Sequence, residues 1–288
     1  MIDYRKLIEV GLHFGHQKSR WCPRMEPYIW GHRGGIHLID ISKTAHALQK
    51  ATTFLETVVA RGEMVLWVGT KKPAKDAIVQ VGLATGMPYV DYRWVGGTIT
   101  NYNQVKKAVT KLLHYDDVVA KSSLENSPYT KKEVVKFQKL AERLRRIFGG
   151  LKTLNMPIGA VVIIDVRKEQ SALLEAISGN IPVVALVDSN SDPRDIQYVI
   201  PGNDDTANGI AFVLDYLKEG VLRGLSQRVA VTKKSKDATD ELKAKGLMNT
   251  SAGVEFLNDS EDEEDSKKNK MHSKPVMQKS PKKAILKK

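Results

Sequence analysis

The chain contains aspartate and histidine side chains whose types suit the binding of a metal ion. Two aspartates follow an apolar run at 182–187, and two more stand in the sequence GNDD at 202–205. In an α/β protein such positions fall at strand ends or helix starts, where the loops gather. Carboxylates bind hard cations, and a histidine adds a nitrogen ligand. The sequence predicts a divalent cation site, for zinc or magnesium, formed by His16, Asp188, Asp192, Asp204 and Asp205.

The same residue types have a simpler use, which the sequence leaves open. Asp, Asn and Ser form turns and cap helices without any bound ion. The pair His13 and His16 does not make a metal site alone, because two ligands are too few. No nucleophile is paired with a general base, and the single cysteine, Cys22, is expected to be a packed residue. We therefore expect no catalysis and no cofactor that the protein requires.

Two segments, 18–37 and 91–107, combine basic with aromatic residues and lack apolar periodicity. Basic groups bind phosphates, and aromatic rings stack on unpaired bases. A third basic segment is the turn VGTKKPAK (68–75), which leads into a helix expected to begin at Pro73. We predict an RNA-binding surface that comprises Lys18, Arg20, Trp21, Arg24, Arg33, Lys71, Lys72, Arg93, Trp94, Asn101, Lys106 and Lys107.

Other readings of these segments stay open. At least one of Trp21, Trp30 and Trp94 should pack against the sheet instead of meeting RNA. The turn at 68–75 could hold the phosphate of a nucleotide, although it matches neither G-x-G-x-x-G nor G-x-x-x-x-G-K-[ST]. A sugar-phosphate or nucleotide-binding enzyme is therefore the alternative function.

The balance of charge favours a nucleic-acid partner. The 288 residues include 45 Lys or Arg and 33 Asp or Glu, which gives a net charge of +12. Contacts from such a surface to phosphates release counterions and so favour binding. One cysteine excludes a disulfide scaffold, and no stretch approaches the roughly 18 apolar residues of a membrane span. With no signal peptide at the N-terminus, we expect a cytoplasmic protein without membrane contact.

The elements that position these residues alternate between strand and helix from 36 to 224. Helices are expected from Ser42 to Gly62, from Pro73 to Thr85, and over 168–178 and 204–222, with Asn203 as the last N-cap. Val- and Ile-rich runs predict strands at 36–41, 64–68, 88–92, 158–165, 182–188 and 197–201. The predicted fold class is therefore α/β, with a doubly wound parallel sheet.

Two regions depart from this alternation. Over 101–150, apolar residues at three- and four-residue steps, among them Leu112, Leu113, Leu140 and Leu144, predict an inserted helical hairpin with coiled-coil character. From 225 to 288, opposed acidic and basic blocks predict a charged, largely disordered tail. The predicted domains are 1–224, an α/β RNA-binding unit that includes the hairpin, and 225–288.

Long segments of the chain resemble one known family. They are GLHFGHQKSRWCPRM, YIWGHRGGIHLIDISKT, LWVGTKK, YRWVGGTITN, IDVRKE, IPVVALVDSNSDP and VIPGNDDTANGI. Together, and in this order, they are similar to small-subunit ribosomal protein number two of the bacterial or organellar type. The resemblance covers about residues 3–224. Cys22 departs from it, since the family usually has Asn there, and so does Pro73, where Gln or Ala is more frequent.

The resemblance implies a flavodoxin-like sheet with a protruding coiled-coil hairpin and a structural role in the small ribosomal subunit. The implied partners are small-subunit rRNA, other small-subunit ribosomal proteins and the mRNA-binding protein number one. No small-molecule substrate is implied. The absence of an Arg- and Ser-rich transit segment favours a bacterial source over an organelle.

Overall fold

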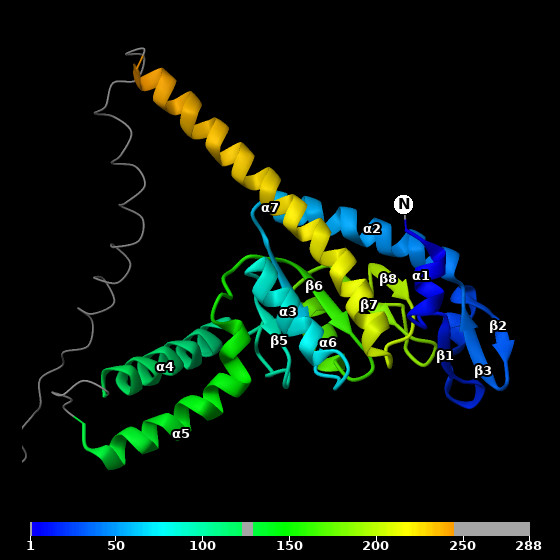
Figure 1. Cartoon of the computed structure of the whole chain (residues 1–288), viewed down its shortest axis with the longest axis horizontal. Helices are drawn as coiled ribbons and strands as arrows, with labels where there is room; N and C mark the ends of the chain where they lie inside the picture. Colours follow the sequence, from blue (N-terminus) through cyan, green and yellow to red (C-terminus); the bar gives the residue numbers. More distant parts are fainter. Residues whose placement is uncertain (1, 123–128, 245–288) are drawn as a thin grey trace, which may run out of the picture. The chain divides into compact units, whose positions relative to one another are not determined.

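The structure is a computed structural model that describes residues 2–122 and 129–244 (Figure 1). The strands are β1 (Phe14–Gln17), β2 (Ile29–Arg33), β3 (Ile36–Ile39), β4 (Met64–Val68), β5 (Tyr89–Val90), β6 (Ile158–Ile164), β7 (Val183–Val187) and β8 (Tyr198–Pro201). The α-helices are α1 (Tyr4–Glu9), α2 (Ile41–Ala60), α3 (Lys75–Thr85), α4 (Tyr102–Lys121), α5 (Lys131–Phe148), α6 (Gln170–Ser178) and α7 (Ala207–Ala244). Short 3-10 helices span Lys18–Arg20, Pro23–Tyr28 and Gly149–Leu151. Among the described residues, no helix combines the length and apolar character that crossing a membrane requires.

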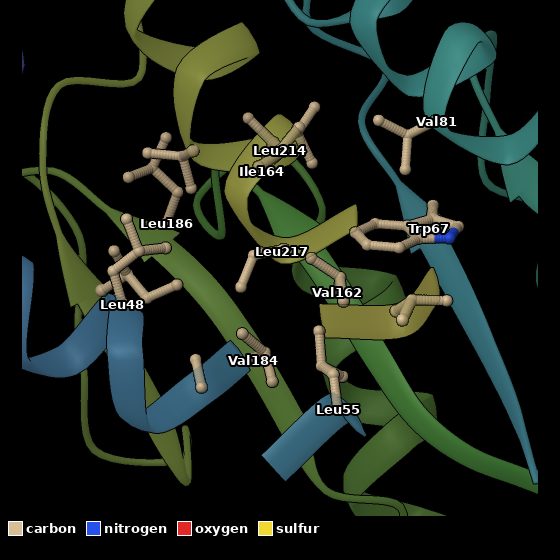
Figure 2. Packing of buried hydrophobic residues seen from close by; sticks show 14 of the residues in the cluster. Leu48, Leu55, Trp67, Val81, Val162, Ile164, Val184, Leu186, Leu214 and Leu217 are labelled. Atoms are coloured by element: carbon tan, nitrogen blue, oxygen red, sulfur yellow. The ribbon is translucent and has the colours of Figure 1, made fainter. Parts of the chain in front are cut away.

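Five strands form a parallel sheet in the order β5-β4-β6-β7-β8, and the parallel arrangement agrees with the sequence prediction. Alternate residues of a strand face opposite sides, so β4 contributes Trp67 to one core and Leu66 to the other. Helices α2, α3 and α7 pack on the Trp67 side, where Figure 2 shows the interlocking side chains. Helix α6 and the loop around Trp94 cover the opposite side. The two cores confirm the doubly wound α/β class.

Strand β4 lies where the order of the sheet reverses. From β4 the chain passes through α3 to β5 on one side, while the next strand of the sheet, β6, pairs with β4 on its other side. The loops that follow β4 and β6 therefore lead away from each other at their carboxyl ends. This divergence leaves a crevice, which is the usual ligand position in sheets of this class.

The strand predicted at 36–41 does not belong to the parallel sheet. It is β3, which pairs antiparallel with β1 and β2 in a separate three-stranded sheet. The helix that follows begins at Ile41, because Asp40 and not Ser42 provides the cap. The Ser42 amide donates to the Asp40 carboxylate at 3.0 Å.

Two further helix starts differ from the prediction. Helix α3 begins at Lys75 rather than Pro73, because a turn closed by the Ala74 amide and the Lys71 carbonyl precedes it. Helix α7 begins at Ala207, so Asp204 and Asp205 stand before the helix and not in its first turn. The side-chain oxygen of Asn203 accepts a hydrogen bond from the Asp205 amide instead of capping the helix.

The predicted hairpin is present as α4 and α5 (Figure 1). Thr130 and Glu133 form a capping box at the start of α5. Leu112 is fully buried and Ala141 nearly so, whereas Leu113 is 49% exposed. Leu113 therefore does not belong to the seam, the buried contact between the two helices. Residues 123–128, which lie between the two helices in the sequence, are outside the described residues.

Helix α7 continues through the boundary predicted at 224 and reaches Ala244. Leu225 packs against the larger core, and Gln227 Nε2 donates to Glu56 Oε1 at 2.6 Å. The first compact unit accordingly spans Met1–Thr232. The rest of the predicted tail, 245–288, lies outside the described residues.

Candidate functional site

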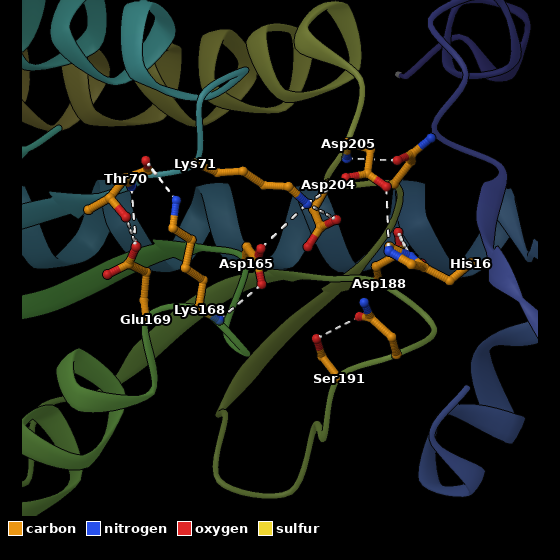
Figure 3. A network of polar contacts seen from close by, with 12 residues as sticks. His16, Thr70, Lys71, Asp165, Lys168, Glu169, Asp188, Ser191, Asp204 and Asp205 are labelled. Atoms are coloured by element: carbon orange, nitrogen blue, oxygen red, sulfur yellow. Dashed lines mark hydrogen bonds and ion pairs between the residues drawn. The ribbon is translucent and has the colours of Figure 1, made fainter. Parts of the chain in front are cut away.

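Four of the five predicted cation ligands lie together beyond the carboxyl ends of the strands (Figure 3). His16 belongs to β1, Asp188 follows β7, and Asp204 and Asp205 lie between β8 and α7. Each offers one ligand atom, and these atoms lie within 4.8 Å of one another. The chain thus brings residues from both ends of the sequence into one cluster, as the prediction requires.

The fifth predicted ligand, Asp192, is not part of this cluster. Its carboxylate forms an ion pair with Arg24 and another with Arg194, the latter at 2.9 Å. These two guanidinium groups hold the pKa of Asp192 below its usual value, with hydrogen bonds from Arg194 as the largest cause. The structure does not bring Asp192 to the other four predicted ligands, because spacing along a loop does not fix where each carboxylate points.

A close approach between β1 and the loop after β7 places His16 in the cluster. The His16 amide donates to Ser189 Oγ at 2.8 Å, which ties β1 to the loop after β7. At Gly15, a Cβ atom would stand 2.8 Å from Ser189 Oγ, closer than side chains pack. A glycine at this position therefore permits the contact. Nδ1 of His16 then lies 2.9 Å from Asp188 Oδ2.

Lys71 enters the same cluster from the loop after β4 (Figure 3). Its Nζ lies 2.7 Å from an oxygen of Asp204, 2.7 Å from one of Asp205 and 3.4 Å from one of Asp165. Burial by itself would lower the pKa of Lys71, but its hydrogen bonds to Asp204 and Asp205 raise it above the usual value. The positive charge of Lys71, which the sequence predicts to contact an RNA phosphate, is therefore neutralised by carboxylates of the protein itself.

The cluster still holds more carboxylates than positive charge. Burial raises the pKa of Asp204 to about 7, and the nearby carboxylates of Asp165 and Asp188 add to that effect. Asp204 Oδ2 is buried and has no hydrogen-bond partner among the described residues. The hydrogen bond to Asp188 raises the pKa of His16 above its ordinary value. Within the described part of the chain, the partnerless oxygen of Asp204 is the one geometric feature of the cluster that leaves room for a further donor or cation.

Most of the predicted RNA-binding residues lie on the surface. Three of the predicted residues differ: Trp21 is half-buried, with its ring 5.1 Å from that of His37, Lys71 lies in the carboxylate cluster, and Trp94 is buried. The exposed members are Lys18, Arg20, Arg24, Arg33, Lys72, Arg93, Asn101, Lys106 and Lys107.

Trp94 is the clear correction within this set. It is only 7% exposed and belongs to the smaller core, so it does not offer a face to an unpaired base. Its Nε1 donates to Glu175 Oε1 at 2.9 Å. The sequence could not separate this buried ring from Trp30, which is 75% exposed.

Sequence reasoning missed two glutamates that organise the surrounding loops, the half-buried Glu175 and the buried Glu169. Glu175 in α6 accepts hydrogen bonds from Trp94 and from the amides of Gly97 and Ile99. Glu169, just before α6, accepts from the amide and the hydroxyl of Thr70, and burial raises its pKa. A lone glutamate at a predicted helix start carries no signal that would distinguish it from a solvated residue.

Comparison with known proteins identifies the family. The family model described as Ribosomal protein S2 matches residues 7–224. The chain belongs to the ribosomal protein S2 family. The matched range contains every segment on which the resemblance in the sequence rests. It also includes the carboxylate cluster and the hairpin.

Individual members of the S2 family match most of the chain. The small ribosomal subunit protein uS2 of Geotalea uraniireducens is 39% identical over 253 residues, which are 88% of this chain and 98% of the relative. The protein of the same name from Chloroflexus aurantiacus is 41% identical over 228 residues, or 79% of this chain and 95% of the relative. The likeness therefore covers the whole folded unit and is not confined to the motifs.

Proposed function

We propose that this S2-family chain is a structural protein of the small ribosomal subunit and binds small-subunit rRNA. The observation that carries the proposal is the match over 7–224 to a ribosomal protein family. A set of exposed cations that make no ion pair with any described residue supports the RNA contact. These cations are Lys18, Arg20, Arg33, Lys72, Arg93, Lys106 and Lys107.

Surface cations without an ion pair contribute more to the binding of phosphates than to the stability of the fold. An exposed ion pair contributes little to folding, whereas each phosphate contact releases a counterion. Asn101 lies beside these cations along the chain and offers a neutral donor for sugar or phosphate oxygens. Arg24, by contrast, is engaged by Asp192, so its contact with RNA would have to displace that carboxylate.

Contacts with other small-subunit ribosomal proteins, including the mRNA-binding protein number one, belong to the same proposal. Trp30 in β2, at 75% exposure, supports a protein contact, because large aromatic side chains are enriched at protein interfaces. The location that follows is the ribosome in the cytoplasm of a bacterium. We propose no catalysis, and the sugar-phosphate or nucleotide enzyme is the disfavoured alternative.

Sedimentation of a cell lysate in a density gradient tests this function. The protein should travel with the small subunit and move to the top of the gradient only when high salt strips the subunit. An enzyme would remain at the top under all conditions. An antibody against the chain, with a known small-subunit protein as the position marker, reports the outcome.

A second proposal is a divalent cation, zinc or magnesium, held by His16, Asp188, Asp204 and Asp205. The buried Oδ2 of Asp204, without a partner among the described residues, supports it. One nitrogen and several carboxylate oxygens are ligands that zinc accepts, whereas magnesium would use the oxygens and water. Because Lys71 already contacts Asp204 and Asp205, the ion would share these carboxylates with an ammonium group.

A further inference from the structure

Two adjoining hollows on the first compact unit carry far more basic than acidic side chains in their lining. One, of about 900 Å³, lies beside Thr70, Trp94 and Glu169, and the other, of about 550 Å³, lies beside Tyr89 and Asp91. Both are also lined by Lys75 and Tyr92, which join them into one groove. The basic residues of this groove are Lys72, Lys75, Arg93, Arg145, Arg146, Lys152 and Lys168.

The groove begins at the crevice where the order of the sheet reverses. Thr70 and Lys72 follow β4, and Lys168 and Glu169 follow β6, so the two diverging loops form one side of it. The other side comes from the loop after β5 and from the end of α5, which carries Arg146. Among the described residues, two carboxyl groups, Asp91 and Glu169, line the groove.

Tyr92 holds two of the cations without neutralising them. Lys75 Nζ lies 5.0 Å from the centre of the Tyr92 ring, and the guanidinium carbon of Arg146 lies 4.1 Å from it. A ring attracts a cation through its quadrupole and leaves the full charge in place. Neither Lys75 nor Arg146 makes an ion pair with a described residue.

The neighbouring cations show the contrast. Arg145 and Lys152 both contact Asp116, at 2.6 and 3.0 Å, and these hydrogen bonds lower the pKa of Asp116 although burial alone would raise it. Their charges are therefore largely balanced within the protein. The unbalanced charge of the groove is concentrated on the two cations that Tyr92 positions, together with Lys72, Arg93 and Lys168.

Close packing fixes Arg146 relative to the sheet. Helix α5 ends at Phe148, and the chain then passes directly against β5. A Cβ atom at Gly150 would lie 2.3 Å from the Tyr89 carbonyl oxygen, so only glycine permits this approach. The root of the hairpin and the edge of the sheet thus form one rigid wall around Tyr92.

We propose that this groove binds the phosphodiester backbone of RNA, and that Tyr92 is the residue that positions Lys75 and Arg146 for the phosphates. The proposal rests on the proposed function and adds a contact surface to it. Charge spread over two joined hollows fits successive phosphates of a strand, whereas a free nucleotide would occupy one. The open crevice and the absence of a glycine-rich phosphate loop at 68–75 agree with an extended ligand.

The test measures the affinity of the full chain for small subunits stripped of this protein, over a series of salt concentrations. Each lost phosphate contact lowers the log–log salt slope by about 0.7 to 0.9. The double variant Lys75→Ala/Arg146→Ala should therefore flatten the slope by about 1.5. Tyr92→Leu should weaken binding in the same direction, while Tyr92→Phe keeps the ring and should bind as the wild type does. Circular dichroism melting checks that each variant is folded.

Lys50→Ala is the matched control. Lys50 lies 5.9 Å above the ring of Tyr198, a residue of β8 at the opposite edge of the sheet, so the change removes an equivalent cation–ring pair elsewhere. Its salt slope should equal that of the wild type. An equal loss in Lys50→Ala, or an unchanged slope in the double variant, would overturn the assignment of the groove.

Three further outcomes separate the alternatives. Adenosine monophosphate at millimolar concentration should not displace the chain from subunits. If the nucleotide binds one-to-one and displaces the chain, the ligand of the groove is a small nucleotide and not RNA. A wild-type chain that fails to bind stripped subunits would refute the proposed function itself. If the wild type binds and every groove variant binds with the same affinity and salt slope, the groove is not the RNA contact, while the proposed function stands.

Discussion

Trp94 donates its indole Nε1–H to Oε1 of Glu175 across 2.9 Å, and this bond anchors the loop between β5 and α4 to helix α6. The amides of Gly97 and Ile99 donate to the same carboxylate at 2.8 and 3.1 Å. One half-buried glutamate therefore organises a loop that also carries the exposed Arg93. The order of this loop depends on that carboxylate.

Glu175→Ala should lower the free energy of unfolding by about 2 kcal/mol at neutral pH, because several donors lose a charged acceptor. Burial alone would raise the pKa of Glu175, but its hydrogen bonds, led by that from Trp94, lower it below 4.5. The stabilisation is thus present above that value and is lost as the pH falls through the lower pKa of the folded state. Denaturant titrations should show the gap between wild type and variant closing in acid.

Glu142→Ala is the control for this prediction, because Glu142 is exposed on α5. It should change the unfolding free energy by less than about 0.5 kcal/mol. A gap for Glu175→Ala that stays constant down to the lowest accessible pH would contradict the role given to its ionised carboxylate.

Leu112 and Leu113 are adjacent in α4 but differ in burial. Leu112 is fully buried in the hairpin and Leu113 is 49% exposed. Leu112→Ala should cost about 3 kcal/mol through the lost contacts and the cavity, whereas Leu113→Ala should cost less than about 1 kcal/mol. Thermal and denaturant unfolding of the two variants measure the difference. Equal losses would mean that the seam of the hairpin has been placed on the wrong face.

Metal analysis tests the cation site. After removal of adventitious ions and dialysis against zinc, the wild type should retain about one equivalent. The double variant His16→Ala/Asp188→Asn should retain none. Asp192→Asn should behave as the wild type does, because Asp192 pairs with Arg24 and Arg194 outside the cluster. A wild type that holds no metal, with either zinc or magnesium, would leave Lys71 as the counter-charge of the aspartates.

Truncation distinguishes the two ends proposed for the folded unit. Removal of the residues after Thr232 should leave the melting temperature unchanged, since the first compact unit ends there. Removal of the residues after Gly224 also deletes Leu225 and Gln227, which contact the core and Glu56. This shorter chain should lose about 2 kcal/mol of stability. Identical stability of the two truncations would restore the boundary predicted at 224.

The sequence predicts the parallel sheet well because its signal is local. The run MVLWV coincides with β4, and the runs at 158–165 and 182–188 contain β6 and β7 with few residues to spare. A short continuous apolar run between turns is typical of a parallel strand that is buried on both faces. Helix starts are less certain, because two neighbouring residues such as Asp40 and Ser42 are both competent caps.

The candidate site could be predicted only in part, because its contacts are distant along the chain. Lys71 meets Asp204 across 133 positions, and no local pattern distinguishes it from its exposed neighbour Lys72. Asp192 and Asp188 stand in one loop, yet only Asp188 turns toward His16. Trp94 could not be recognised as buried without knowledge of its partner Glu175 in another element.

Binding of the purified chain to isolated ribosomal subunits tests the central claim most directly. Small subunits stripped of this protein by high salt should bind it in a ratio close to one-to-one, and large subunits should bind none under the same conditions. The complex should dissociate as salt rises, since phosphate contacts dominate its stability. Equal binding to both subunits, or a chain that stays free of small subunits at low salt, would contradict a structural role in the small subunit.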